Sequence, residues 1–394
     1  MKQTRRKITS LHILTVCFLA ILAVFGVMNF DTLLADMSKV AEGEMESVDD
    51  AIDTIEADYN EEFFRKNDFL NVNGLVNNWM GVRVLNERAK LDNGQLTYYY
   101  TGGSVEENSQ NLIALNEFLQ QRDIPLLYVQ APCKIDPDDP QLPAGVEDDT
   151  NEKADEFLDQ IEKGGVPYLD LREEMEADGL DHYSMFFSTD HHWTPKAAFW
   201  GYGKLIEYMN EQYGYEIDSS YYDLENYNVQ TYEDWFLGSH GKRVGIYYGG
   251  VDDIDVITPK FPTNLTFTAP SQDIERTGPF DQSILAQERI ETKDYFNGSP
   301  YTVYTGGDYG RSTYRNEQAP CNKKILVVKD SYALPVLAFS SLCFESIDAI
   351  DLRYYKADTL VNYIEKTQPD AVVIFYTVPN ASDVLEDEMF SFGL

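Results

Sequence analysis

The stretch KKILVVKDSYALP, residues 323–335, decides the fold class that the sequence predicts. It begins with a near-continuous run of Ile, Leu and Val and then changes to Asp330, Ser331 and Tyr332. A short apolar run bounded by polar residues is typical of a strand that is buried on both faces of a parallel sheet. Similar runs occupy residues 125–132 and 370–378, so we expect several such strands.

Segments with apolar residues at helical spacing separate these runs. They are residues 108–122, 151–163, 194–213 and 358–366. Alternating strands and helices predict an α/β domain with a parallel sheet and helices on both faces. The alternation stops between about residues 214 and 318, where Tyr, Asp, Gly and Asn dominate. We therefore expect a long, irregular, β-containing insertion there.

The composition limits the possible functions. The chain has 394 residues, of which 43% are hydrophobic, and a formal net charge of −36 at pH 7. Nucleic acid is not an expected partner, because phosphate binding needs a basic surface. The four cysteines show no CxxC spacing, and Cys17 lies in an apolar N-terminal segment. At most one disulfide could therefore form among Cys133, Cys321 and Cys343.

The N-terminus predicts a membrane anchor. Lys2, Arg5, Arg6 and Lys7 precede residues 8–30, which contain no charged side chain. A helix of this length spans roughly 35 Å, enough for one crossing of a bilayer. Because the basic flank stays inside, the rest of the chain is expected outside the cytoplasm. A cleaved signal peptide, and hence a secreted protein, is the alternative.

The predicted organisation has three parts. Residues 1–30 form the anchor or signal peptide, residues 31–90 form a juxtamembrane helical stalk, and residues 91–394 form the α/β domain. The acidic run in the stalk is typical of a solvated helix face.

Two adjacent histidines occur in the run FFSTDHHWTPKAAFWGYGKL, residues 186–205. Thr194 and Pro195 predict the start of a helix, so Asp190 and His192 are expected in a loop before it. A carboxylate two residues from a histidine can accept from one ring nitrogen and leave the other free as a base. His191 is the alternative base. The structural alternative is a capping aspartate with two histidines packed against aromatic neighbours.

Ser331 follows an apolar strand, where α/β sheets present ligands and catalytic groups. A serine there can act as a nucleophile if a histidine accepts its proton. The two motifs together predict a triad of Asp190, His192 and Ser331. A plain turn after the strand is the alternative. This chemistry requires no metal and no organic cofactor.

These motifs carry a resemblance to a known family. DHHW at residues 190–193, KDSYA at residues 329–333 and IDLRYY at residues 350–355 resemble the DHHW protein family. That family is related to the alginate O-acetyltransferase proteins AlgJ and AlgX. The resemblance covers roughly residues 65–394. It implies an SGNH-hydrolase-like (flavodoxin-like) domain, preceded here by the transmembrane helix.

The resemblance also implies site residues. An Asp-x-His motif and a later serine after a strand match Asp190, His192 and Ser331. The SGNH residues that complete the oxyanion hole have no clear match, so the Ser331 backbone N–H is the only donor that we name. The family's sugar-binding module cannot be placed.

Four further residues are candidates for substrate binding. Lys134 and Arg353 lie just after apolar strands and could meet an anionic or carbonyl group, or they could form surface ion pairs. Trp193 and Tyr332 flank the triad positions and could stack on a sugar, or they could be core aromatics. The glycine-rich run at residues 238–245 lacks the Lys-Ser/Thr ending of a phosphate loop and is interpreted as a turn.

The motifs predict a membrane-tethered, extracytoplasmic serine acyltransferase or esterase. The resemblance implies that it acts as an acetyltransferase or esterase on a cell-surface or extracellular polysaccharide. A membrane-bound O-acyltransferase is an expected supplier of acyl groups. The main alternative is a non-catalytic glycan-binding or scaffold protein of a polysaccharide-modification complex. A secreted esterase is the third possibility.

Overall fold

The computed structural model of the protein describes residues 10–30, 34, 63–385 and 389–394. By its contacts the chain divides into two units, residues 1–73 and 74–394. Helix α1 (Ser10–Met28) lies in the first unit, and helix α4 (Lys66–Trp79) begins there. No helix within the described ranges is long and apolar enough to span a membrane, so the predicted transmembrane helix is not found. Most of the predicted stalk lies outside the described residues.

The second unit is built on an eight-stranded sheet. In spatial order the strands are β5 (Tyr168–Asp170), β4 (Leu126–Ala131), β13 (Ala371–Thr377), β11 (Cys321–Lys329), β12 (Phe344–Ile350), β10 (Arg311–Arg315), β8 (Leu265–Ala269) and β9 (Ile274–Gly278). The first five strands are parallel, and the last three extend the sheet in an antiparallel manner. The predicted α/β fold with a mostly parallel central sheet is therefore confirmed.

One part of the fold prediction is wrong. In the flavodoxin-like order the last strand lies at an edge of the sheet. Here β13 lies between β4 and β11, with Val373 paired with both Leu127 and Val327. Helix α13 (Leu360–Thr367) carries the chain past β11 before it enters the sheet, and a local strand pattern contains no information on that crossing.

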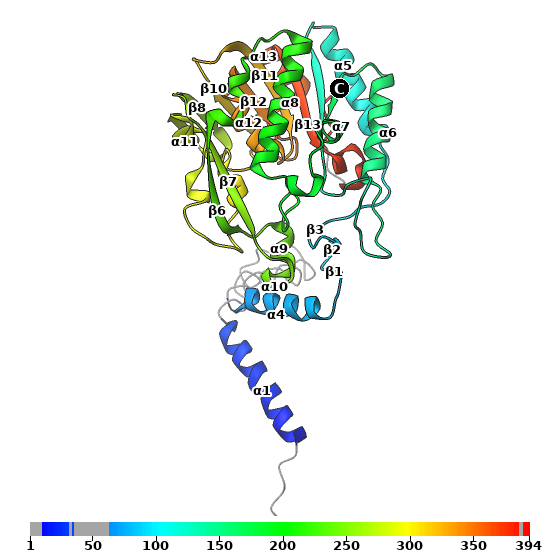
Figure 1. Ribbon diagram of the computed structural model, residues 1–394, viewed down its shortest axis with the longest axis vertical. Helices are drawn as coiled ribbons and strands as arrows, with labels where there is room; N and C mark the ends of the chain where they lie inside the picture. Colours follow the sequence, from blue (N-terminus) through cyan, green and yellow to red (C-terminus); the bar gives the residue numbers. More distant parts are fainter. Residues whose placement is uncertain (1–9, 31–33, 35–62, 386–388) are drawn as a thin grey trace, which may run out of the picture. The chain divides into compact units, whose positions relative to one another are not determined.

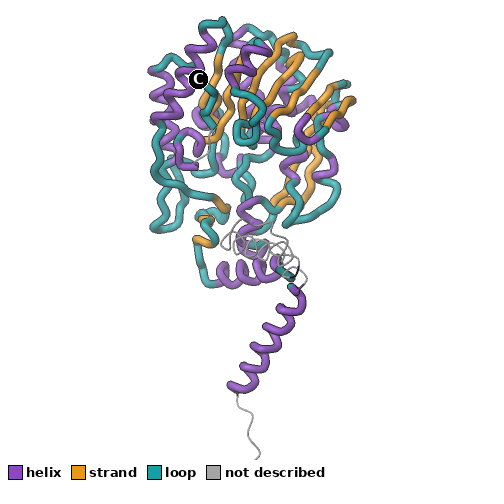
Figure 2. Tube along the Cα trace, turned by 180° about the vertical axis from the view of Figure 1, so that it is seen from behind, coloured by secondary structure: helices purple, strands orange, loops and turns teal. Residues whose placement is uncertain are grey.

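Helices cover both faces of the sheet, as Figures 1 and 2 show from opposite sides. Alternate residues of a strand point to opposite faces. In β4, Leu127 and Val129 join the core formed with α8 (Pro195–Tyr213) and α12 (Ala333–Ser340). Leu126 and Tyr128 join a second core with α13. Helices α5 (Glu106–Gln120) and α6 (Thr150–Lys163) also belong to this second core.

The segment between α8 and β11 has no strand–helix alternation. It contains a separate hairpin of β6 (Tyr227–Phe236) and β7 (Asp252–Pro259), followed by the three strands that extend the main sheet. Its short helices are α9 (Ser239–Val244), α10 (Ile246–Gly249) and α11 (Phe280–Ser283), with 3₁₀ turns η2 (Ser219–Tyr221), η3 (Leu224–Asn226), η4 (Pro270–Gln272), η5 (Gln287–Arg289) and η6 (Pro300–Val303). This is the irregular, β-containing insertion that the sequence predicts.

Several elements were not predicted. Helix α12 is apolar on all sides and contains Pro335, so it has no amphipathic pattern. Helix α7 (Leu171–Ala177) is short and begins at a cap from Asp170. A small sheet of β1 (Val84–Leu85), β2 (Arg88–Lys90) and β3 (Leu96–Thr97) crosses the predicted boundary at residue 90. Other short turns are η1 (His182–Met185), η7 (Val378–Ala381) and η8 (Asp383–Leu385).

The cysteines do not form a disulfide among the described residues. Cys133, Cys321 and Cys343 are buried free thiols. Burial raises the pKa of the Cys133 and Cys343 thiols to about 12, so both stay protonated near neutral pH. They are core residues rather than nucleophiles.

Candidate active site

Ser331 lies in the turn that joins β11 to α12, at the carboxyl end of the parallel strands. The turn is tied to the neighbouring strand end by Asp330. Its carboxylate accepts hydrogen bonds from the backbone N–H of Thr377 (2.8 Å), the Thr377 hydroxyl (2.9 Å) and the Asn380 amide (2.8 Å). The backbone N–H of Ser331 makes no hydrogen bond among the described residues, so it is free to meet an oxyanion.

The segment between Phe186 and Trp193 carries the two adjacent histidines and is called the histidine loop. It is held just before α8. Thr194 caps this helix by accepting from the backbone N–H of Ala197 at 3.2 Å, and Pro195 is in the first turn. A β-bridge joins Phe186 to Trp193 on either side of the loop. The helix therefore begins at Thr194 and Pro195, the two residues from which the sequence predicted a loop followed by a helix start.

The structure brings Asp190, His192 and Ser331 together. The Nε2 atom of His192 lies 2.7 Å from Ser331 Oγ, and its Nδ1 atom lies 2.5 Å from Asp190 Oδ1. With the proton on Nδ1, the imidazole donates to the carboxylate and accepts the serine hydroxyl proton at Nε2. His192 is only 8% exposed, so water competes little with these two hydrogen bonds.

Asp190 is held as a carboxylate. Its Oδ1 also accepts from the backbone N–H of His192 at 2.9 Å, and its Oδ2 accepts from the backbone N–H of Ser239 at 2.6 Å. Burial alone would raise the pKa of this carboxyl, but the imidazoles of His191 and His192 lower it well below its usual value.

His191, the alternative base, is oriented differently. Its Nδ1 atom lies 2.9 Å from Ser239 Oγ, and no hydrogen bond joins it to Ser331 in the described part of the chain. Burial and the neighbouring His192 lower its pKa, so it is neutral near pH 7. His191 lines the cavity next to the triad.

Trp193 and Tyr332 connect the two motifs, and Tyr332 also lines the cavity next to Ser331, whereas Trp193 does not. The Trp193 indole N–H donates to the Tyr332 carbonyl at 3.0 Å, and the Tyr332 hydroxyl donates to the His191 carbonyl. Trp193 is fully buried, as expected for a core aromatic, and Tyr332 is 1% exposed. These two hydrogen bonds hold the histidine loop against the turn that contains Ser331.

Lys134 is buried under the histidine loop. Its ammonium donates to the carbonyl oxygens of Leu96 (2.6 Å) and Asp190. Burial lowers its pKa to about 8. Because the Lys134 ammonium donates to these backbone carbonyl oxygens, Lys134 positions the histidine loop. It does not line the cavity, although the sequence predicted a substrate-binding role for it.

A cavity of about 310 Å³ opens over Ser331. Its charged and polar lining residues include Arg88, Arg243, Arg353, His191, His240 and Ser239. Arg353 is at this cavity as predicted, but it is paired with Asp351 at 2.7 Å. Arg88 and Arg243 form no ion pair with an acid in the described ranges, and burial together with Arg243 lowers the pKa of Arg88.

Asp190, His191 and His192 could also be considered as metal ligands. Their ligand atoms lie within 4.8 Å of one another. Both ring nitrogens of His192 are hydrogen-bonded, and each Asp190 oxygen accepts from a backbone N–H. A cation would have to displace the Ser331–His192 contact, so the donor set fits a hydrogen-bonded triad better than a metal site.

Several residues at the site were not predicted. Ser239 belongs to the glycine-rich run that the sequence analysis interpreted as a turn, and it begins α9 beside Asp190. Tyr301 stacks on His192 with ring centroids 4.0 Å apart, and its hydroxyl donates to the Ser331 carbonyl at 3.3 Å. Arg88 and Arg243 come from β2 and α9. None of these positions carries a motif, because their roles depend on long-range packing.

A serine–histidine–aspartate arrangement at the strand ends of a parallel α/β sheet occurs in more than one family of serine hydrolases and acyltransferases. Residues 95–234 match the family described as ALGX, SGNH hydrolase-like domain, acetyltransferase AlgX. This match includes the histidine loop and ends before Ser331. Residues 95–234 are therefore similar to an AlgX-type SGNH hydrolase-like domain, in agreement with the resemblance that the motifs carry. No curated protein sequence matches the chain.

Solved structures share the fold. PatB1 from Bacillus cereus has a TM-score of 0.64 and 21% identity, and the match covers 77% of this chain and 99% of PatB1. PatB1 has also been solved with a sulfonyl adduct, with a TM-score of 0.62, 21% identity, and coverage of 77% and 98%. A DHHW family protein from Eubacterium siraeum has a TM-score of 0.52 and 18% identity, with coverage of 75% and 91%. At these identities the likeness concerns the fold alone.

Proposed function

We propose that the protein is an acyltransferase that moves an acetyl group to or from a polysaccharide through Ser331, His192 and Asp190. The observation that carries the proposal is the 2.7 Å contact between Ser331 Oγ and His192 Nε2, continued by the 2.5 Å contact from His192 Nδ1 to Asp190. This geometry is what nucleophilic catalysis by serine requires.

The reaction proceeds in two halves. Ser331 Oγ attacks the acyl carbonyl while its proton passes to His192 Nε2. The leaving alcohol takes that proton as the tetrahedral intermediate collapses, which leaves an acyl ester on Ser331. The acceptor hydroxyl then attacks the ester with His192 as base, and the proton returns to Ser331.

The remaining groups support these steps. Asp190 keeps His192 in the required tautomer and stabilises the imidazolium that forms. The Ser331 backbone N–H faces the developing oxyanion. Asn380 is not a donor in this arrangement, because its amide nitrogen already donates to Asp330 (2.8 Å) and Thr377 (3.1 Å).

The nucleophile can be tested directly. A sulfonyl fluoride should modify the wild-type protein at Ser331, detected by mass spectrometry of the labelled peptide; a sulfonyl adduct is also what was solved for PatB1. Ser331→Ala and His192→Ala should lose the label, whereas Ser340→Ala, at a buried serine of α12, should keep it. Labelling of the Ser331→Ala variant at the wild-type rate would refute the proposal and favour the non-catalytic scaffold.

The direction of transfer needs a second measurement. The protein is incubated with an activated acetyl ester and a neutral oligosaccharide, and both acetate and acetylated sugar are quantified. Acetylated sugar in excess over acetate would show a transferase, and acetate alone would show an esterase. Activity that survives a chelator would fit the cofactor-free mechanism.

The location of the protein remains part of the proposal. The basic flank before the uncharged residues 8–30 supports a tether in the cell membrane with the catalytic domain outside the cytoplasm. A membrane-bound O-acyltransferase would then supply the acyl groups. Protease added to intact cells should remove the domain; complete protection would contradict this topology.

A further inference from the structure

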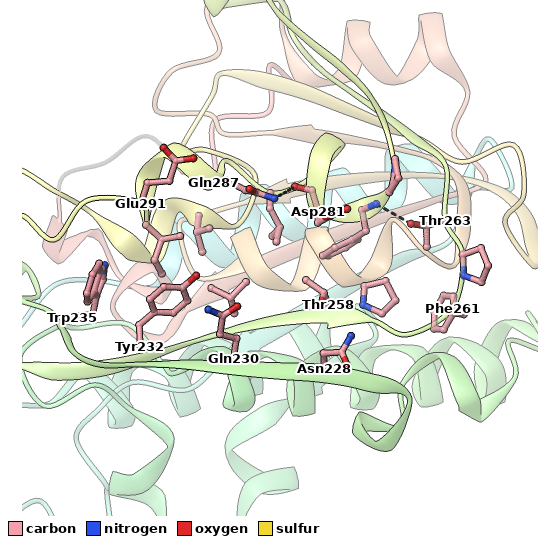
Figure 3. A pocket seen from close by; sticks show the side chains of 18 residues that line it. Asn228, Gln230, Tyr232, Trp235, Thr258, Phe261, Thr263, Asp281, Gln287 and Glu291 are labelled. Carbon is pink, nitrogen blue, oxygen red and sulfur yellow. Dashed lines mark hydrogen bonds between the residues drawn. The ribbon is translucent and has the colours of Figure 1, made fainter.

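The insertion contains a second cavity that shares no lining residue with the one over Ser331. It has a volume of about 750 Å³ and lies between β6 and β7 on one side and residues 279–303 on the other. Figure 3 shows its residues: Trp235, Tyr232, Gln230 and Asn228 follow one another along β6, with Phe261 at the far end. We call this cavity the hairpin groove.

The β6 wall presents a row of side chains to one side. Asn228, Gln230 and Tyr232 are alternate residues, so their side chains share one face of the strand. Asn228 and Gln230 are exposed, and their side-chain amides make no hydrogen bond in the described part of the chain. Each amide offers both donors and an acceptor to a ligand.

Aromatic rings lie at both ends of this row. Tyr232 and Trp235 are half-buried with ring centroids 5.5 Å apart, and Phe261 is half-buried at the opposite end. Lys293 packs over the Trp235 ring, with 5.4 Å from its Nζ to the centroid. The indole nitrogen of Trp235 is buried without a hydrogen-bond partner among the described residues.

The charge of the lining selects the ligand. The groove is lined by Asp281 and Glu291 and by no lysine or arginine. Figure 3 places both acids on the wall opposite β6. An acidic ligand would therefore be repelled, whereas hydroxyl groups and flat apolar faces match the free amides and the rings.

We propose that the hairpin groove binds an uncharged segment of the polysaccharide, away from the site of acyl transfer. This proposal rests on the proposed function for the identity of the polymer. The two sites are connected by η6: Val303 lines the groove, and Tyr301 stacks on His192. A polymer held in the groove would raise the local concentration of its other hydroxyl groups near Ser331.

Binding can be measured without catalysis. Calorimetric titrations of the full-length protein use neutral β-1,4-linked hexaoses of glucose, N-acetylglucosamine and mannose, with an oligogalacturonate as the acidic comparison. At least one neutral hexaose should bind, and Ser331→Ala should bind it as well as wild type. Trp235→Ala and Gln230→Ala should each weaken binding at least tenfold, and the oligogalacturonate should bind more weakly.

The control is Tyr247→Ala, at a tyrosine that is exposed on α10 and outside both cavities. It should leave the affinity unchanged. Gln230 is exposed, so its variant remains informative if Trp235→Ala fails to fold. Three results would overturn the proposal: binding to no neutral hexaose, wild-type affinity in both groove variants, or tighter binding of the acidic oligomer than of the neutral ones. Hexaose binding without sulfonyl labelling of Ser331 would retain the groove and reject the catalytic function.

Discussion

At the scale of single residues, His192 is the centre of the site because both of its ring nitrogens are engaged. Asp190 fixes one nitrogen and Ser331 meets the other, at 2.5 and 2.7 Å. His191 differs only in orientation, since its hydrogen bond goes to Ser239. Two adjacent and chemically identical side chains thus have separate roles.

Replacing the carboxylate tests this division. Asp190→Asn should leave the fold intact and lower kcat for ester hydrolysis by about four decades, because an amide can hold the imidazole in the wrong tautomer. His191→Ala should retain most of the activity. Both are measured by steady-state kinetics on an activated acetyl ester. A larger loss in the His191 variant than in the Asp190 variant would transfer the base role to His191.

The same carboxylate should make stability depend on pH. The pKa of Asp190 in the folded protein lies well below its usual value of about 3.9. The ionised group therefore stabilises the fold above the unfolded pKa, and this stabilisation is lost as the pH falls through the folded pKa. The free energy of unfolding can be measured with denaturant for wild type and for Asp190→Asn. The difference between the two free energies should be constant above about pH 5 and should become smaller below about pH 4. A difference that grows on acidification would contradict this.

At the scale of elements, the site depends on close contact between the insertion and the histidine loop. Gly238 precedes α9, and a Cβ atom there would lie 2.3 Å from Asp190 Cβ and 2.5 Å from the Thr189 carbonyl oxygen. Only a glycine lets Ser239 donate its backbone N–H to Asp190 at 2.6 Å. The close approach to Asp190 and Thr189 therefore explains why position 238 is a glycine. The sequence analysis had interpreted this glycine-rich run only as a turn.

Gly238→Ala should therefore displace Asp190 and lower ester hydrolysis by at least tenfold. Gly203→Ala is the matched control. A Cβ at Gly203 in α8 would meet nothing closer than 3.8 Å, and alanine in a helix interior adds roughly 0.5–1 kcal/mol of stability. Activity and thermal unfolding are measured for both. Full activity in Gly238→Ala would show that Asp190 does not need this support.

The elements also show where sequence reasoning succeeds. Strand β11, helix α8 and the pairing of Asp190 with His192 follow from local patterns, namely an apolar run, a Thr-Pro helix start and an Asp-x-His spacing. Helix α12 was missed because it is apolar all round. Ser239, Tyr301 and Arg88 could not be found, because they reach the site through contacts between segments far apart in the chain.

At the scale of the whole molecule, an acidic protein surrounds a basic cavity. The net charge is −36, yet Arg88 and Arg243 line the cavity over Ser331 without an acidic partner among the described residues. From the sequence, we expected Lys134 and Arg353 to provide the positive charge at the substrate site. One of these is buried under the loop and the other is paired with Asp351. Unpaired guanidinium groups near the nucleophile favour a negatively charged transition state.

Removing these charges should slow catalysis. Arg88→Gln and Arg243→Gln should each lower kcat/KM for the ester by about threefold to tenfold, consistent with screened interactions of about 1 kcal/mol. Added salt should inhibit wild type more than the double variant. Arg315→Gln, at an exposed arginine of β10, serves as the control. Equal salt dependence in wild type and the double variant would exclude an electrostatic role.

The central position of β13 has a consequence for how the chain matures. During synthesis, β4 with β5 and β11 with β12 emerge as two pairs with open edges, and residues 371–377 arrive last to join them. The same late segment supplies Thr377, which binds Asp330 beside the nucleophile. A nascent chain stalled at residue 370 should therefore be cut readily by protease and hydrolyse no ester, and release of the full chain should restore both properties together. Esterase activity would then appear only after β13 has joined the sheet, so incomplete chains would not react with esters.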